Sequence, residues 1–375
     1  MNPLRIILTN TNLDGRHGSA LYIRDLALEL LRREHLPVVY SPVIGMVGQE
    51  IRAATVPVVD NLAKVAFEAD IIHGHHRHET MAALIRFPNV PAIYFCHGWT
   101  PWQEQPLLHP RILRYVAVDD TCRDRLLEEG IPEGKIRVVL NFVDFKRFWP
   151  RSRLPEHPRR ALLFSNYARR DKDVPVVQQA CAQAGIELDV VGSGVGRPVE
   201  QPEKILGRYD LVFARGRCAL EAMAVGAAVV VISTSGIGAM VTTANFDRLR
   251  SLNFGQRSIQ KPLTRDGLLQ EIACYNAQDA AAVSRRLRAE AALDSVADQL
   301  QALYREVIEE FQSVKRPAAE DEPRIHAGFI AELIEWRERL QHEVEKPLSL
   351  ILKKLQQFPL SVRLSHWCAQ LGRRE

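Results

Sequence analysis

The chain of 375 residues lacks the features that identify several classes of protein. It contains no run of about 18 apolar residues, so the sequence predicts no membrane-spanning helix. Its six cysteines are scattered without a CxxC pair, which indicates reduced thiols rather than a disulfide framework. The formal net charge of +4 is too small to indicate binding to nucleic acid. No charged N-terminal region precedes an apolar stretch and a cleavage site, so we expect a cytoplasmic protein.

Hydrophobic residues make up 46% of the chain and charged residues 25%, which is typical of a soluble globular protein. The length predicts two domains and an extension, because a single core rarely holds so many residues. Apolar runs of strand length alternate with helical patterns, which predicts parallel sheets built from right-handed β-α-β units. Residues 149–158 carry three prolines and no periodicity, so we interpret them as the linker between a first domain, 1–150, and a second, 159–312.

The expected strands of the first domain are 5–9, 38–41, 70–73, 92–96, 115–118 and 136–140, and those of the second are 161–165, 188–191, 211–213 and 229–233. Helices near 268–274 and 280–311 are expected to complete the second domain. Ligands in such doubly wound folds bind beyond the carboxyl ends of the strands, so we expect the site in a cleft between the two domains.

A third segment, 324–375, differs from both domains. Apolar residues recur at helical spacing from Ile325 to Val344, with charges between them. Residues 346–375 carry six Lys or Arg against one Glu. We expect a helical amphipathic extension that packs on the first domain, associates with another subunit, or lies on the inner face of an anionic membrane. The packed helix is the simplest of these interpretations.

The most informative stretch is 219–230. It combines a helix start of small residues, the single carboxylate of Glu221, a stop at Gly226 and a β-branched run. This pattern predicts a helix packed closely on a sheet and followed by a buried strand. A carboxylate near a helix N-terminus is placed to accept hydrogen bonds from ligand hydroxyls while the helix amides face a phosphate.

Four histidines lie between residues 73 and 78, but their spacing at a strand end does not bring four nitrogens together, so we predict no metal site. Gly15 and Gly18 lie in the first strand–helix loop, where backbone amides could approach a ligand. His97 ends a buried strand, and Trp99 follows it in a loop, where an indole could stack on a sugar. Gly192 and Gly194 suggest a dinucleotide loop, but the third glycine of that motif is absent.

These segments, with 15–27, 69–78, 91–99 and 115–150, resemble the retaining GT-B glycosyltransferases of family 4, over about residues 1–310. The resemblance implies two Rossmann-like domains that face a cleft. It implies transfer of a sugar from a nucleoside-diphosphate sugar to a glycan, lipid or small-molecule acceptor, with retention at the anomeric carbon. It also implies that no metal or other cofactor takes part.

The resemblance also implies roles for individual residues. Glu221 would bind the ribose, and His97 would orient the transferred sugar. The diphosphate would be held by cationic side chains and by amides at a helix start, at Arg170, Lys172, Gly216, Arg217 and Cys218. The loop of Gly192 and Gly194 would approach the nucleotide base, and that of Gly15 and Gly18 the donor phosphate or the acceptor.

Two positions depart from the family pattern. A second glutamate is usual eight residues before Glu221, where this chain has Phe213, and an arginine is usual where it has Asn166. These departures keep a second hypothesis open, a non-catalytic partner protein that binds sugar nucleotides or glycans. A sugar-nucleotide epimerase would need paired carboxylates, and the sequence shows no obvious pair. Base, sugar and acceptor are not specified by the sequence.

Overall fold

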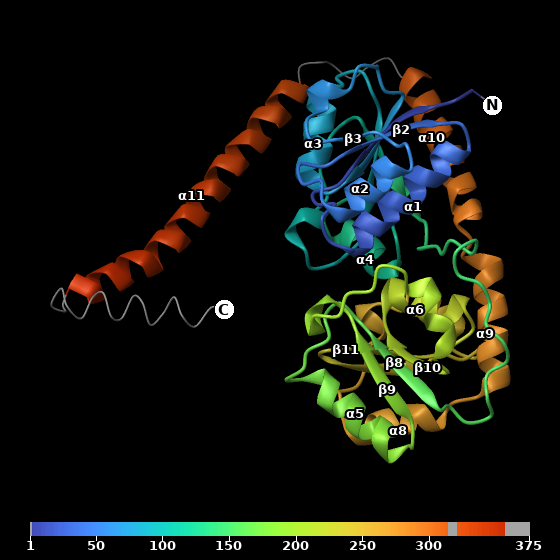
Figure 1. The fold of residues 1–375 in the computed structure, drawn as a ribbon. Helices are drawn as coiled ribbons and strands as arrows, with labels where there is room; N and C mark the ends of the chain where they lie inside the picture. Colours follow the sequence, from blue (N-terminus) through green and yellow to red (C-terminus); the bar gives the residue numbers. More distant parts are fainter. Residues whose placement is uncertain (1, 314–320, 357–375) are drawn as a thin grey trace. The chain divides into compact units, whose positions relative to one another are not determined.

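The computed structural model describes residues 2–313 and 321–356, with side chains described to residue 339. The chain divides into two units, one formed by residues before α11 and the other containing α11 (Asp321–Gln356) (Figure 1). The first unit contains two sheets, each with its own helices, which we call the first and second lobes. This confirms the predicted α/β fold with two parallel-dominated sheets.

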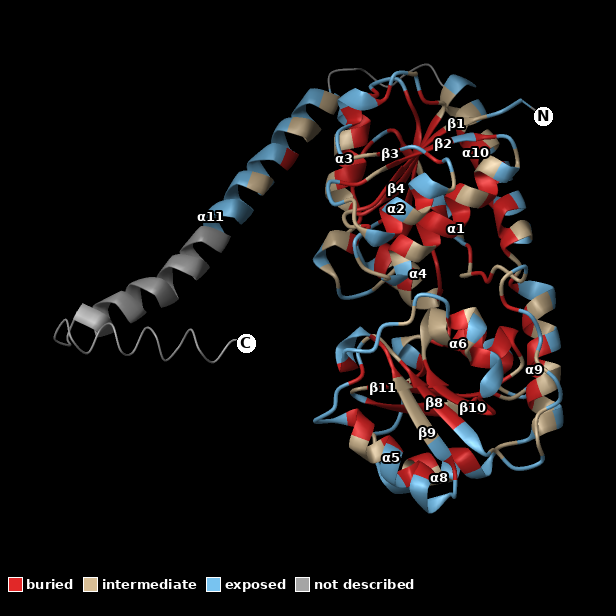
Figure 2. Cartoon of the chain, in the orientation of Figure 1, coloured by how far each residue is buried: buried red, intermediate tan, exposed pale blue. Residues whose placement is uncertain are grey.

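The first lobe is built on a seven-stranded parallel sheet with the order β3-β2-β1-β4-β5-β6-β7. Its central strands are buried, apart from Arg5 at the start of β1, because helices cover both faces, as the apolar run Ile6–Leu8 predicts (Figure 2). The strands are β1 (Arg5–Thr9), β2 (Leu36–Tyr40), β3 (Val58–Val59), β4 (Ile71–His75), β5 (Ala92–Cys96), β6 (Ile112–Ala117) and β7 (Ile136–Val138), and the helices α1 (Gly18–Arg32), α2 (Met46–Ala53), α3 (Arg77–Arg86) and α4 (Asp120–Glu128).

The second lobe is built on a five-stranded sheet with the order β12-β11-β10-β8-β9, in which β12 alone runs antiparallel. Its strands are β8 (Arg160–Phe164), β9 (Glu187–Val191), β10 (Leu211–Ala214), β11 (Ala228–Ser233) and β12 (Gly236–Met240), and its helices α5 (Asp173–Gln183), α6 (Gly216–Ala224), α7 (Phe246–Ser251), α8 (Arg265–Ala273) and α9 (Ala277–Glu290). Single-turn helices lie at Leu62–Lys64, Trp102–Glu104, Glu133–Lys135, Ser193–Val195, Pro202–Lys204, Leu206–Arg208 and Gln256–Ser258.

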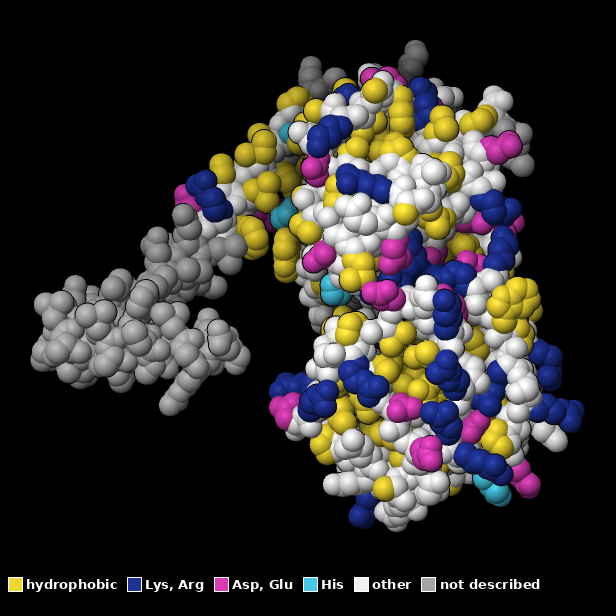
Figure 3. Space-filling model, viewed as in Figure 1, with side chains coloured by type: hydrophobic (Ala, Val, Ile, Leu, Met, Phe, Trp, Pro, Cys, Tyr) yellow, Lys and Arg dark blue, Asp and Glu magenta, His cyan; other side chains and the backbone are white. Residues whose placement is uncertain are grey.

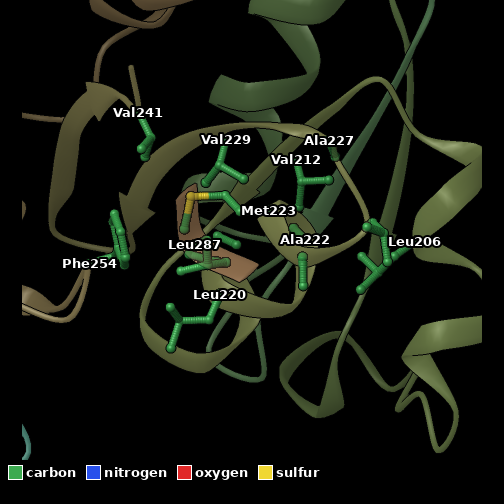
Figure 4. Close-up of a cluster of buried hydrophobic side chains, with 14 of the residues drawn as sticks. Leu206, Val212, Leu220, Ala222, Met223, Ala227, Val229, Val241, Phe254 and Leu287 are labelled. Carbon is green, nitrogen blue, oxygen red and sulfur yellow. The ribbon is translucent and has the colours of Figure 1, made fainter. Parts of the chain in front are cut away.

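The helix predicted around Glu221 is α6, which packs against β10 and β11. Its apolar face, with Leu220 and Met223, is enclosed by side chains of the sheet and of α9 (Figure 4). Alanines on the same helix let it approach the sheet closely. This packing fixes the N-terminal end of α6 relative to the carboxyl ends of the strands.

The helix α10 (Leu293–Ser313) crosses back to the first lobe, where it packs against α1, β5 and β6. The sequence alone groups 280–311 with the second domain, whereas the structure places the C-terminal part of that stretch on the first sheet. The reason is an apolar stripe, including Leu300 and Tyr304, that is buried there. The chain therefore passes between the lobes twice. The two crossings pair with each other, because Val143 donates to the carbonyl of Ala291 and Leu293 donates to that of Val143.

The extension forms a helix over residues 321–356, three residues earlier than predicted. The rest of the predicted extension, 357–375, lies outside the described residues. Within residues 2–313 and 321–356, none of the helices combines the length and the apolar character that a membrane span requires. What the extension contacts stays a prediction.

Candidate functional site

The predicted site residues follow the carboxyl ends of neighbouring strands. In the first lobe these strands are β1 and β5, on either side of β4, and in the second they are β8, β9 and β10. Because parallel strands end at the same edge of a sheet, their loops gather at one end of each lobe. Hydrogen bonds and ion pairs join the two ends. We call this region, formed by loops 10–17, 165–172 and 192–196 with the first turns of α1 and α6, the junction.

Asn166 holds three of these loops together. Its Nδ2 donates to the backbone carbonyl of Arg16 at 3.2 Å, across the two lobes. Its Oδ1 accepts from the amide of Ser193 at 3.2 Å, and its own carbonyl accepts from the amide of Gly194 at 3.0 Å. The residue that departs from the family pattern therefore has a structural role in this chain.

The glycines of the loop after β9 are needed for its close approach to the loop after β8. A Cβ at Gly192, where φ is +138°, would lie 1.9 Å from the carbonyl oxygen of Ser165. A Cβ at Gly194 would lie 2.4 Å from the carbonyl oxygen of Ala168. Loop packing thus explains both glycines, and their predicted contact with a nucleotide base stays a prediction.

The predicted cationic residues of the loop after β8 are exposed. Arg170 donates from Nη2 to the carbonyl of Val195 at 2.7 Å, which adds a further hydrogen bond between the two loops. Lys172 immediately precedes α5, and its amine makes no hydrogen bond to any residue of the described ranges. In the opposing loop, Gly15 packs against the ring of His17, whereas Gly18 opens α1 with free space beside it.

The start of α6 brings two predicted residues into direct contact. Arg217 donates from Nε to Oε1 of Glu221 at 2.8 Å, one helical turn apart. Its Nη2 also reaches Asp25 of α1, so the guanidinium lies between a carboxylate of each lobe. The three side chains are only 13%, 6% and 4% exposed, respectively, which makes this a buried ionic contact.

Further arginines surround Asp25. Arg24 bonds Asp25 at 2.7 Å and Glu50 at 2.8 Å, and Arg147 lies 3.6 Å from Asp25. Burial by itself would raise the pKa of Asp25, but the arginines outweigh it and the pKa is lowered. The opposite balance holds at Glu221, where burial raises the pKa even with Arg217 beside it. Charged side chains of both signs gather between the lobes (Figure 3).

The remaining residues predicted for a ligand at the start of α6 are Gly216 and Cys218. Gly216 has φ +54°, and its amide donates to the carbonyl of Phe254 at 2.8 Å. That amide is therefore occupied, which leaves Arg217 and Cys218 as the predicted sources of amides for a phosphate. Phe213 is fully buried within β10, between Leu163 and Val230 of the adjacent strands. A carboxylate at this position would lie in the core rather than in the junction.

His97 belongs to a row of imidazoles at the carboxyl ends of β4 and β5. Its Nε2 lies 2.8 Å from Nδ1 of His75, and Nε2 of His75 lies 2.7 Å from Nε2 of His73. Desolvation in this position lowers the pKa of His97 to about 4, although Glu104 nearby favours the protonated ring. The ring is therefore neutral near pH 7. Trp99, which follows in the loop, is 41% exposed.

Tyr22 connects the histidines to the ionic contact, and sequence reasoning did not select it. Its ring packs edge-on against His97 with centroids 5.0 Å apart, and Asp25 follows one turn later on α1. The residue is 2% exposed, and its hydroxyl has no hydrogen-bond partner among the described residues. An unsatisfied buried hydroxyl at this place is a candidate ligand contact.

Comparisons with known proteins agree with this architecture. Residues 16–147 match the sequence model of the family described as Glycosyltransferase Family 4. A glycosyltransferase from Rickettsia africae has the same fold, with a TM-score of 0.60 at 15% identity over 82% of this chain and 99% of that one. The structure of Anabaena HepE in complex with UDP and glucose is also similar. Its TM-score is 0.55 at 15% sequence identity, over 83% of this chain and 100% of that one.

Sucrose-phosphate synthase from Thermosynechococcus elongatus is similar as well, with a TM-score of 0.53 at 15% identity over 82% of this chain and 100% of that one. No curated protein sequence matches this chain significantly. At such low identity these structures show the fold alone, and that fold is GT-B. Together with the match over the first lobe, it is consistent with a glycosyltransferase of the family 4 type and supports a glycosyltransferase function.

Proposed function

We propose that this protein transfers a sugar from a nucleoside-diphosphate sugar to a carbohydrate, lipid-linked or small-molecule acceptor, with retention at the anomeric carbon. The observation that carries the proposal is the position of Glu221. This buried carboxylate lies near the N-terminus of α6, in the junction, and Arg217 holds one of its oxygens. Its Oε2 accepts no hydrogen bond from the described residues. A carboxylate held in this way suits recognition of paired ribose hydroxyls.

The other residues of the junction fit the same ligand. Lys172 and Arg170 supply exposed positive charge beside the loop of Gly192 and Gly194, where a diphosphate and a base would lie. The N-terminal end of α6 adds its partial positive charge. Such cations and amides stabilise a departing diphosphate electrostatically, so the reaction that we propose requires no metal.

On the side of the first lobe, His97 would contact the transferred sugar and Trp99 would offer an apolar face to a sugar ring. The loop of Gly15 and Gly18 would lie near the donor phosphate or the acceptor. UDP and UDP-glucose bind to HepE, as its structures state, and this chain shares the fold of HepE. These similarities support a nucleotide sugar as the donor.

A panel of nucleotide sugars with glycan, lipid and small-molecule acceptors tests the proposal, in buffer with and without EDTA. We expect release of nucleoside diphosphate, transfer of the sugar, and an NMR coupling that shows retention. Glu221→Ala should reduce turnover at least about 100-fold, because it removes a ligand contact in a site of low dielectric.

Glu271→Ala is the matched control. Glu271 is also a buried carboxylate of the second lobe, and it accepts from the amide of Met240 on β12, outside the junction. Its loss should reduce stability but leave turnover per folded molecule unchanged. Thermal stabilisation by nucleotide sugars without diphosphate release would support the alternative, a non-catalytic binding protein. Equal turnover in wild type and Glu221→Ala would contradict the site.

A further inference from the structure

Four rings, three of them fully buried, form an unbroken line of hydrogen bonds from α10 to the junction. The hydroxyl of Tyr304 lies 2.6 Å from Nδ1 of His73. Nε2 of His73 lies 2.7 Å from Nε2 of His75, and Nδ1 of His75 lies 2.8 Å from Nε2 of His97. Tyr304, His73 and His75 are fully buried, so water cannot replace any of these partners.

Each contact in this line needs one proton, and each neutral imidazole carries one. The protons can therefore be arranged in two ways. In the outward arrangement Tyr304 donates, each ring passes a donor to the next, and His97 is left with its proton on Nδ1. In the inward arrangement His97 donates from Nε2, and every bond runs the other way, toward Tyr304.

The two arrangements differ in whether the hydroxyl of Tyr304 has an acceptor for its proton. In the inward arrangement its oxygen accepts from His73, and its own O–H then needs another acceptor. The hydroxyl has no second partner in the described part of the chain, and the residue is fully buried. A buried donor without an acceptor is unfavourable. The outward arrangement satisfies Tyr304 and both buried imidazoles.

The free proton of the outward arrangement lies at the half-buried end of the line. His97 is the one ring of the four that is not fully buried, and its Nδ1 has no hydrogen-bond partner in the described ranges. An N–H at this end can therefore meet water or a ligand. We propose that Tyr304, through His73 and His75, fixes the tautomer of His97 so that its Nδ1–H is presented to a ligand oxygen.

In this proposal Tyr304 is a positioning residue, because it acts on the site through His97. It does so although it lies on α10, far along the chain from the other residues of the site. The ligand oxygen would be a sugar hydroxyl or a phosphate oxygen, and this step rests on the proposed function. His97 acts there as a neutral hydrogen-bond donor and not as a base. The low pKa of His97 agrees with this, because the ring does not take up a second proton near pH 7.

Nitrogen NMR of the full-length protein labelled with ¹⁵N-histidine tests the tautomers directly at pH 7.5, without any ligand. We expect a protonated Nδ1 and an unprotonated Nε2 for His97 and His75, and the reverse for His73. The signals of His97 are assigned from those lost in His97→Gln. A protonated Nε2 on His97 in the wild type would overturn the proposal.

Tyr304→Phe removes the terminal donor and keeps the ring. We expect mixed tautomers at His97, seen as ¹⁵N shifts between the two extremes. We also expect turnover of a nucleotide sugar to fall about 3- to 10-fold, which is the effect of weakening one hydrogen bond. Unchanged ¹⁵N shifts in Tyr304→Phe would contradict the role of Tyr304.

Tyr115→Phe is the matched control. The hydroxyl of Tyr115 is also buried in the first lobe, but it donates to the carbonyl of Leu107 at 2.7 Å, and no hydrogen bond joins it to His73, His75 or His97. Its loss should leave the His97 tautomer and turnover per folded molecule unchanged. If no nucleotide sugar binds, the proposed function fails while the NMR result stands. If turnover occurs with the opposite tautomer, only this inference fails.

Discussion

Arg217 at the start of α6 forms a buried ion pair with Asp25 of α1, so a cation of the second lobe meets an anion of the first. The same guanidinium bonds Glu221, the carboxylate that we assign to the ligand. The pairing between the lobes and the ligand recognition that we propose therefore depend on one side chain. Changes at Asp25 should affect both.

Asp25→Asn should lower the free energy of unfolding by about 3 to 5 kcal/mol, because it leaves buried arginines without their shared carboxylate. Urea unfolding measures this. Asp298→Asn is the control, since Asp298 is 72% exposed and its pairing with Arg33 should contribute no more than about 1 kcal/mol. Equal losses in the two variants would show that the contact between Asp25 and Arg217 does not stabilise the protein.

Tyr22→Phe should have opposite effects on stability and on ligand binding. The hydroxyl of Tyr22 is buried without a partner, so its removal should raise the free energy of unfolding by about 1 kcal/mol. If the hydroxyl contacts the ligand, the affinity for the nucleotide sugar should fall. In the control, Tyr94→Phe, stability should fall by about 1 kcal/mol, because Tyr94 donates to the carbonyl of Gln105. A loss of stability in both variants would contradict this account of Tyr22.

The buried histidines predict a loss of stability in mild acid. Burial lowers the pKa of His73 and His75 well below 6.5, and that of His97 to about 4. Below pH 6.5 the unfolded chain takes up protons that the folded protein does not. Stability should therefore be complete above pH 6.5 and fall as the pH approaches 4, by at most about 1.4 kcal/mol per pH unit for each ring.

Urea unfolding at pH 7 and pH 5 measures this difference. Two neighbours modify the pKa of His97. Glu104, which accepts from the amide of His97, favours the protonated ring and so reduces the dependence of stability on pH, whereas His76 opposes protonation. His97→Gln should show a smaller difference between the two pH values than the wild type. Identical stability of the wild type at both values would show that the rings are not held neutral.

Lys172→Ala should reduce turnover about 100-fold or more without changing stability by more than about 0.5 kcal/mol. The reason is that its exposed amine has no partner to lose in the described structure, but would face the diphosphate. Lys204→Ala provides the comparison, because Lys204 is an exposed lysine of the same lobe, in a single-turn helix outside the junction. Full activity of Lys172→Ala would remove this residue from the site.

The two sheets could be predicted from the sequence because buried parallel strands appear as continuous apolar runs, such as Ile6–Leu8 and Val229–Ile232. Glu221 could be selected for a similar reason, since a carboxylate in an otherwise apolar helix is a local signal. The contact with Asp25 was not predictable, because it joins two lobes and depends on their packing. The one sign of this contact in the sequence was the carboxylate of Asp25 among the apolar positions of α1.

The hydrogen-bonded line of Tyr304, His73, His75 and His97 was likewise not predictable from the sequence. The histidines near residue 73 were visible, but their partner Tyr304 lies 231 positions further along the chain than His73. Only the return of α10 to the first lobe brings them together. The position of Phe213 was also not predictable. Its spacing from Glu221 could not show that this residue of β10 lies in the core of the second lobe rather than beside a ligand.

The paired crossings at Val143 and Ala291–Leu293 have a mechanical consequence. A lobe tethered by one chain segment can rotate freely about it. Two segments that are hydrogen-bonded side by side resist twisting, so bending about their common line is the easiest motion. The lobe between them is, in effect, an insertion whose ends meet at one point. Opening between the lobes, which the proposed transfer needs for substrate entry and product release, would then be a rocking movement about a single axis.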